Sequence, residues 1–211
     1  MILHAISDTH SNHKYYKQDK CDILTHSGDY ANSRANSCNE FLSFLDWFKD
    51  QEARYKIFIS GNHDFETFNN LKWCRKEIEK RGLIYLENES ITIEGVKFYG
   101  TPWVPQFFNW AYMTTENRLE KIYSCIDDDT QVLLTHTPPY KTLDKTNSAK
   151  HVGSKSLLHR IKEIDSIKLV VSGHIHESTG ILDRYNKKFI NASSFISTRD
   201  YIEIDLKEII K

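Results

Sequence analysis

Short apolar segments recur along the chain, and each of them ends in a small residue followed by a polar one. Runs of aliphatic and β-branched residues with few polar interruptions are typical of strands that are buried on both faces. The five clearest segments are Ile2–Ser7, Ile23–Gly28, Ile57–Gly61, Val132–Thr135 and Leu169–Gly173. The polar residues that follow them directly are Asp8, Asp29, Asn62, His136 and His174.

Amphipathic segments lie between these strands. Apolar residues three or four positions apart predict helices around Phe41–Phe48, Leu71–Lys80 and Glu116–Ile126. Ser154 is a suitable N-terminal cap for a further helix that ends near Ile164. Because strands alternate with helices, we expect an α/β fold with a largely parallel sheet and helices on its faces.

Two hairpins interrupt this alternation, one over Ile91–Tyr99 and one over Gly180–Ile190. The segment Tyr201–Leu206 alternates between apolar and polar residues and predicts a final strand with one face in solvent. The longest expected loops are Thr101–Thr115 and Thr137–Gly153.

Composition narrows the class of protein. The 211 residues are 39% hydrophobic, which predicts one globular domain over residues 1–211. The formal net charge of −1 argues against strong binding to nucleic acid through bulk electrostatics. No long apolar segment predicts a membrane span, and the N-terminus lacks the pattern of a signal peptide. Four widely spaced cysteines without a Cys-x-x-Cys pair fit a reducing cytoplasm.

The polar residues at the strand ends form a candidate metal site, because ligands bind beyond the carboxyl ends of strands in such sheets. Three of the segments end in Ser-Gly, and glycine permits a sharp turn before the donor residue. The oxygen and imidazole donors suit manganese, iron, zinc or nickel. Seven donors exceed the need of one ion and predict two ions that share a carboxylate. They are Asp8, His10, Asp29, Asn62, His136, His174 and His176.

A single buried histidine is more often a hydrogen-bonded core residue than a ligand. The ordered set of motifs at strand ends favours the metal site over that interpretation. The set comprises Asp8-x-His10, Gly28-Asp29, Gly61-Asn62-His63-Asp64, His136 and Gly173-His174-x-His176. In residue type and order it resembles the signature of calcineurin-like metallophosphoesterases, and the resemblance extends from residue 1 to about residue 195.

The resemblance implies a two-sheet β-sandwich flanked by helices, the αββα metallophosphoesterase fold, with a dinuclear metal site at the C-terminal ends of the strands. Four segments are similar to the small metallophosphoesterase-domain branch, whose relatives are class III cyclic-nucleotide phosphodiesterases. These segments are Gly100-Thr101-Pro102-Trp103, Thr135-His136-Thr137-Pro138-Pro139, Gly173-His174-Ile175-His176-Glu177 and Asn191-Ala192-Ser193.

The resemblance also implies roles for the site residues. One ion would be bound by Asp8, His10, Asp29 and His176, and the other by Asp29, Asn62, His136 and His174. A hydroxide that bridges two divalent ions, manganese first among the candidates, would attack the phosphoester. His63 would protonate the leaving group, with Asp64 orienting and charging its ring; the alternative is a supporting role for His63 beside the metals.

The expected substrate is a small phosphodiester. Phosphoprotein phosphatases of this superfamily carry arginines after the Gly-Asp and Gly-Asn-His motifs, whereas this chain has none there, and Arg34 has a different spacing. Without that clamp a dianionic monoester would lose a bidentate partner. We therefore expect hydrolysis of small nucleotide or cyclic-nucleotide diesters. The alternatives are a phosphomonoesterase or protein phosphatase, a nuclease, or a metal-binding scaffold without activity, and an oligomer is left open.

Several other residues have two interpretations. The aromatic residues after Gly100 either stack on a nucleobase or cover one end of the core; they are Trp103, Phe107, Phe108, Trp110 and Tyr112. His13 lies either beside the substrate or on the surface, and His26 either supports ligands or belongs to the core. A last group either approaches phosphate or is solvated, namely Tyr140, Lys141, Lys150 and His151.

Overall fold

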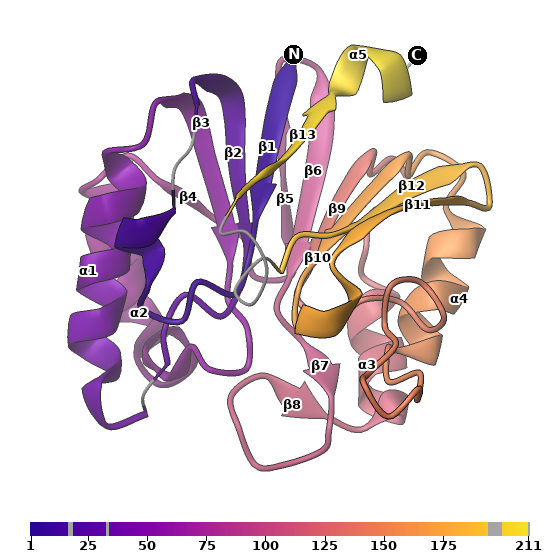
Figure 1. The fold of residues 1–211 in the computed structure, drawn as a ribbon, viewed down its shortest axis with the longest axis horizontal. Helices are drawn as coiled ribbons and strands as arrows, with labels where there is room; N and C mark the ends of the chain where they lie inside the picture. Colours follow the sequence, from indigo (N-terminus) through magenta and orange to yellow (C-terminus); the bar gives the residue numbers. More distant parts are fainter. Residues whose placement is uncertain (17–18, 33, 194–199, 211) are drawn as a thin grey trace.

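The computed structural model describes residues 1–16, 19–32, 34–193 and 200–210. Two β-sheets pack against each other, and helices cover their outer faces (Figure 1). Helices α1 (Ser37–Lys49) and α2 (Phe65–Glu79) lie on one side, and α3 (Glu116–Tyr123) and α4 (Lys155–Glu163) lie on the other. The expected sandwich of two sheets flanked by helices is confirmed.

The first sheet has the strand order β13-β1-β2-β3-β4. Its strands are β1 (Ile2–Ile6), β2 (Cys21–Ser27), β3 (Ala53–Ile59), β4 (Ile84–Tyr85) and β13 (Ile202–Asp205). Strands β1 to β4 run parallel, whereas β13 runs antiparallel to β1, with Ile2 opposite Asp205. The three expected N-terminal strands are therefore neighbours, and their carboxyl ends lie at one edge.

The second sheet has the order β11-β12-β10-β9-β6-β5. Its parallel centre consists of β6 (Val96–Thr101), β9 (Val132–Thr135), β10 (Leu169–Ser172) and β12 (Lys187–Asn191). The antiparallel edge strands β5 (Glu89–Ile93) and β11 (Gly180–Arg184) form the two expected hairpins. A separate parallel pair, β7 (Val104–Pro105) and β8 (Met113–Thr114), closes the base of the aromatic loop, the segment over residues 103–112 that carries the aromatic residues after Gly100.

Helix α2 differs from the sequence expectation, because it begins at Phe65 rather than at Leu71. Its first turn is separated from the rest by a break at Asn70, where φ is −128° and ψ is 36°. That turn buries Glu66 and Thr67, so that it lacks the apolar repeat that marks the later turns. The short elements are η1 (His13–Tyr15), η2 (Arg34–Asn36), η3 (His176–Ser178) and α5 (Leu206–Ile209).

Apolar side chains fill three layers, which explains why the strand segments are apolar on both faces. Leu3 and Ala5 of β1 face the core between the sheets, whereas Ile6 packs under α1 and α2. In β10, Val171 faces the core between the sheets and Val170 packs under α3 and α4. Among the described residues, no helix is both long enough and apolar enough to cross a membrane.

The layer under α1 generates a stability prediction. Phe44 is fully buried, and its ring lies 4.4 Å from that of Tyr30 and 5.3 Å from that of Phe58. We expect Phe44→Ala to lower the free energy of unfolding by about 3–5 kcal/mol, because it removes packed apolar surface and leaves a cavity. Phe108→Ala is the matched control, since Phe108 is 61% exposed. Equal losses of the two variants in urea unfolding would contradict this description of the core.

Candidate metal centre

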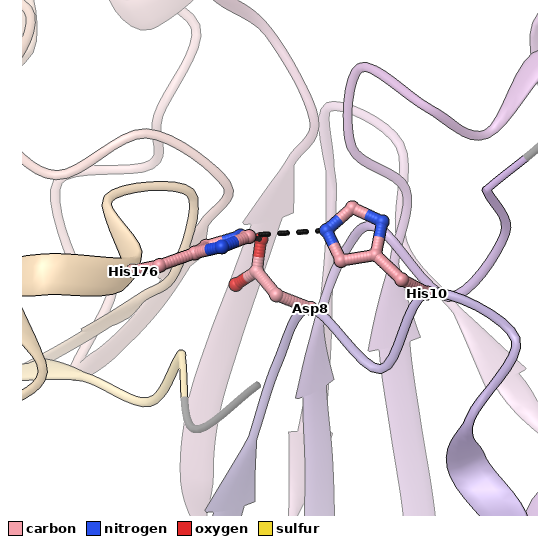
Figure 2. A group of neighbouring side chains, drawn as sticks. All are labelled: Asp8, His10 and His176. Carbon is pink, nitrogen blue, oxygen red and sulfur yellow. Dashed lines mark hydrogen bonds and ion pairs between the residues drawn. The ribbon is translucent and has the colours of Figure 1, made fainter. Parts of the chain in front are cut away.

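The first group of donors joins residues from distant parts of the chain. Asp8 and His10 follow β1, whereas His176 begins η3, after β10. His176 Nε2 lies 3.3 Å from Asp8 Oδ1 and 3.3 Å from His10 Nε2. Figure 2 shows the His176 and His10 rings on either side of the Asp8 carboxylate. The donor atoms of the three residues lie within 4.8 Å of one another, which is close enough to hold a metal ion.

The second group surrounds Asp29. His136 Nε2 lies 3.3 Å from Asp29 Oδ2 and 3.1 Å from Asn62 Oδ1. His174 completes a cluster with Asp29 and His136, in which all donor atoms lie within 4.8 Å of one another. Asp29 Oδ2 also lies 3.9 Å from His10 Nε2. Asp29 therefore stands between the two groups.

The seven candidate ligands come from both sheets and meet where the sheets adjoin. Asp8, His10, Asp29 and Asn62 follow strands β1, β2 and β3 of the first sheet. His136 follows β9 of the second sheet, and His174 and His176 follow β10. The structure thus brings together all of the side chains that the sequence predicted to meet.

The glycines before three of the donors make this approach sterically feasible. Gly28 has φ of +96°, as expected for a sharp turn, and a Cβ there would lie 2.7 Å from His136 Nδ1. The chain also turns directly after Gly61 and Gly173, but neither glycine adopts a left-handed φ, so these turns do not depend on the conformational freedom of glycine. A Cβ on Gly61 would lie 2.6 Å from His136 Cε1, and one on Gly173 would lie closer than 3.0 Å to Asp8. At these two positions, glycine is required by lack of space.

Several candidate ligands themselves have a left-handed backbone. The φ angles are 56° for Asp8, 42° for His10, 56° for Asp29 and 70° for His174. Residues other than glycine adopt this region rarely, and such strained residues cluster at functional sites. The fold therefore maintains an unfavourable backbone conformation at the place where these donors converge.

Burial and mutual charge set the protonation of the donors. Burial opposes ionisation of Asp29, but the charge and hydrogen bond of His136 outweigh it and hold the pKa of Asp29 well below its usual range. Burial lowers the pKa of His136, yet the Asp29 carboxylate outweighs burial and raises this pKa to about 9. Burial lowers the pKa of His174 to about 3. At pH 7 His174 is consequently neutral, whereas His136 is protonated beside Asp29 and would have to release its proton to bind a metal.

These donors fit a divalent transition metal in chemistry and in spacing. Donor atoms bound at roughly 2.0–2.2 Å from one ion lie about 3.0–3.5 Å from their neighbours around it. The separations of 3.1 Å between His136 and Asn62 and 3.3 Å between His136 and Asp29 agree with that spacing. Carboxylate, amide and imidazole donors without a thiolate suit manganese, iron, zinc or nickel.

Asp64 does not have the role that the sequence suggested. Its carboxylate accepts hydrogen bonds from the backbone N–H groups of Gly61 at 2.7 Å, Asp29 at 2.9 Å and Ala31 at 3.0 Å. The expectation that Asp64 orients the His63 ring is therefore wrong. A fully buried carboxylate needs several donors, and buried backbone N–H groups of the loops that carry Asp29 and Asn62 supply them. Asp64 fixes the loops that carry Asp29 and Asn62.

His63 lies beside the candidate ligands. Its backbone N–H donates to Asp29 Oδ1 at 2.8 Å. The centroid of its ring lies 4.9 Å from that of His10 and 4.5 Å from that of Trp110. A ring nitrogen of His63 lies within 4.8 Å of donor atoms of His10 and Asp29. His63 thus adjoins the donors while packing against the aromatic loop.

A cavity of about 730 Å³ opens over the donors, and the aromatic loop forms part of its wall. The core-covering interpretation of this loop holds for Tyr112, whereas nucleobase stacking stays a prediction for the rings that line the cavity. Tyr112 is buried and packs against Trp103, with ring centroids 5.6 Å apart. Phe107 and Trp110 line the cavity, and the Phe107 ring lies 5.6 Å from that of His174.

Two other candidates have purely structural contacts. The Arg34 guanidinium lies 4.2 Å from the centre of the Phe65 ring and donates to the Asn109 carbonyl oxygen at 3.3 Å. It does not line the cavity, so it does not replace the missing arginine clamp. His13 is buried, with Nε2 3.0 Å from Ser43 Oγ, and the expectation of a surface histidine is wrong.

His26 supports the ligand loops from the core, as one interpretation of the sequence suggested. Its Nδ1 accepts the Gly28 N–H at 3.3 Å, and its Nε2 lies 3.1 Å from Thr9 Oγ1. The loop residues considered as phosphate contacts are absent from the described cavity lining; they are Tyr140, Lys141, Lys150 and His151.

Sequence reasoning missed some residues of the cavity wall. Asn32, Thr146 and Val152 line the cavity without belonging to any motif, and Ile175 occupies the unspecified position of Gly173-His174-x-His176. Thr146 and Val152 lie in the loop expected over Thr137–Gly153, whose length was their only signal. Their position depends on long-range contacts of that loop, which the sequence does not display.

Comparisons with known proteins agree with this architecture. Residues 2–178 match the calcineurin-like phosphoesterase family. Metallophosphoesterase domain-containing protein 1 from Homo sapiens is 30% identical over 213 residues, which cover 90% of this chain. The match covers 64% of the human protein, so the chain spans less than two thirds of that relative.

Solved structures share the fold at low sequence identity. An archaeal phosphodiesterase is 16% identical with a TM-score of 0.55, and the match covers 99% of this chain and 96% of that one. A dimetal phosphatase from Danio rerio is 9% identical with a TM-score of 0.53, and the match covers 90% and 86% of the two chains. The family match, the fold and the convergent donors lead to one conclusion: the chain belongs to the calcineurin-like metallophosphoesterase family.

Proposed function

We propose that this chain is a metal-dependent phosphodiesterase that hydrolyses small nucleotide or cyclic-nucleotide diesters. The observation that carries the proposal is the composition of the cavity over the candidate metal ligands. Imidazole, carboxylate and amide groups line its floor, and aromatic and aliphatic side chains line its wall. Within the described part of the chain, no lysine or arginine lines this cavity.

The candidate ligands divide into two sets that share Asp29. We assign Asp8, His10, Asp29 and His176 to one ion and Asp29, Asn62, His136 and His174 to the other. The support for this division is the position of Asp29 between the two clusters of donors. When bound, two divalent cations lower the pKa of a water molecule and neutralise charge on the phosphoryl group. Manganese is the proposed metal, with iron, zinc and nickel as alternatives.

His63 is the proposed general acid. A group that protonates a leaving oxygen must lie within hydrogen-bonding reach of it. His63 adjoins the donors His10 and Asp29 and also lines the cavity, so it lies where the substrate would meet the metals. The Trp110 ring packs against it and restricts its position.

The cavity lining favours a diester over a monoester. A monoester phosphate carries two negative charges near neutral pH, and enzymes usually meet it with a forked guanidinium. Arg34 is engaged with Phe65 and Asn109 and does not reach the cavity. A diester carries one charge and two organic groups, which suits the aromatic wall. The exposed rings of Phe107 and Phe108 offer faces for a nucleobase.

The spacing of the cysteines favours a reducing compartment such as the cytoplasm.

A substrate panel tests the preference for diesters. With added manganese, we expect kcat/KM for bis-p-nitrophenyl phosphate to exceed that for p-nitrophenyl phosphate by about tenfold, because one charge-assisted clamp is missing. The panel includes 2′,3′- and 3′,5′-cyclic nucleotides, single-stranded DNA and a phosphoserine peptide. Turnover of the phosphopeptide above that of every diester would reverse the proposal.

The role of His63 has a separate test that depends on the leaving group. We expect His63→Ala to lower kcat about 100-fold or more for a dinucleotide, whose leaving alkoxide needs a proton. The loss for bis-p-nitrophenyl phosphate is expected to be much smaller, since p-nitrophenolate leaves without protonation. Bound manganese, measured by elemental analysis, checks that the site is intact in the variant. Equal losses on both substrates at unchanged metal content would exclude the acid role.

A further inference from the structure

The loop over residues 141–153, which follows His136, is unusually constrained for a surface connection. Lys141, Leu143 and Ala149 have left-handed φ angles of 60°, 60° and 61°. Such conformations are costly for residues other than glycine and persist only where surrounding contacts enforce them. The contacts that hold the loop in this backbone conformation therefore indicate its function.

The main contact is a buried carboxylate that joins the two ends of the loop. Asp144 is fully buried, and its Oδ1 lies 2.6 Å from His151 Nδ1. Its Oδ2 accepts the Gly153 N–H at 2.9 Å. The Val152 N–H donates to the Asp144 carbonyl oxygen at 3.2 Å. Because an unpaired buried charge is very unfavourable, Asp144 fixes the segment from His151 to Gly153 strongly.

A second set of contacts fixes the loop to the segment that carries His176. The Lys145 N–H donates to Ser178 Oγ at 3.0 Å, and the Ser178 hydroxyl donates to the Lys145 carbonyl oxygen at 2.6 Å. The Asn147 N–H donates to Glu177 Oε1 at 2.9 Å. The loop is therefore held in register with the candidate metal centre rather than free in solvent.

The loop contributes Thr146 and Val152 to the cavity wall. Val152 is 39% exposed, although it is apolar and lies between two residues that Asp144 holds. The aromatic loop contributes Phe107, which is 49% exposed, to the same cavity. Two exposed apolar side chains on separately anchored loops thus line one cavity over the donors.

We propose that Val152 and Phe107 bind the nucleoside of a diester substrate, and that Asp144 and His151 are positioning residues that hold Val152 in the cavity wall. The inference rests on the proposed function, whose substrate class it specifies. Apolar faces bind a nucleobase through contact and desolvation, whatever hydrogen bonds the base makes. Because this contact is the same before and during the reaction, its loss weakens substrate binding and leaves the chemical step unchanged.

Two diesters with the same leaving group separate this contact from the chemistry. Thymidine 5′-(p-nitrophenyl phosphate) carries a nucleoside, and methyl p-nitrophenyl phosphate carries a methyl group in its place. We expect Val152→Ala and His151→Ala to raise KM about fivefold for the thymidine ester. KM for the methyl ester and kcat for both esters are expected to stay within about twofold.

Two further variants make the test specific to the Asp144–His151 pair. His151→Asn retains an N–H donor near the position of Nδ1 and is expected to restore most of the low KM. His159→Ala is the matched control, because His159 lies on α4 with its side chain 73% exposed and is expected to change neither constant. If thermal unfolding shows that His151→Ala does not fold, Val152→Ala and His151→Asn carry the test. An unchanged KM for the thymidine ester, or an equal rise for both esters, would overturn the inference.

Failure of the proposed function would be recognised separately. If the wild-type chain cleaves neither ester, the phosphodiesterase proposal fails, and calorimetric binding of thymidine 5′-monophosphate replaces KM. A Kd raised about fivefold by Val152→Ala and His151→Ala would then support the nucleoside site. A Kd that these variants leave unchanged, or the absence of binding to the wild-type chain, would overturn it.

Discussion

The architecture depends on one buried carboxylate, that of Asp29, at the place where the two sheets adjoin. Its Oδ2 lies 3.3 Å from His136 of the second sheet, and its Oδ1 accepts the His63 N–H at 2.8 Å. A buried charge must be compensated locally, and here the neighbouring histidines and backbone N–H groups compensate it. Asp64, which accepts the Asp29 N–H, fixes the backbone on which this carboxylate sits.

Each of the two sheets supplies different donor groups to the candidate metal site. The first sheet supplies both carboxylates and the amide, and the second supplies three of the four imidazoles among the candidate ligands. Neither sheet alone carries a complete donor set, so the packing of the sandwich is also the assembly of the site. The glycines at positions 28, 61 and 173 allow the two sets to approach, because no Cβ fits between them. The strained φ angles of Asp8, Asp29 and His174 indicate that tertiary packing enforces this approach.

The two-sheet fold and the candidate ligands could be predicted from the sequence, because the strands are apolar on both faces and the motifs follow their carboxyl ends. Because β1, β2 and β3 are parallel neighbours, they end at the same edge of the sheet, and the donors that follow them lie close together. Asp64 was misassigned because adjacency to His63 in sequence does not reveal that its partners are backbone N–H groups of another loop. The part of the cavity wall formed by Val152 was missed, because the hydrogen bond between the Asp144 carboxylate and the His151 ring cannot be inferred from the spacing of these residues in the sequence.

The central claim is that the donors from both sheets bind two divalent cations that share Asp29. Anomalous diffraction at the manganese edge, from crystals of the chain grown with excess manganese, tests this most directly. The account predicts two anomalous peaks about 3.5–4 Å apart, one on each side of the Asp29 carboxylate. A single peak, or no peak among these side chains, would contradict it.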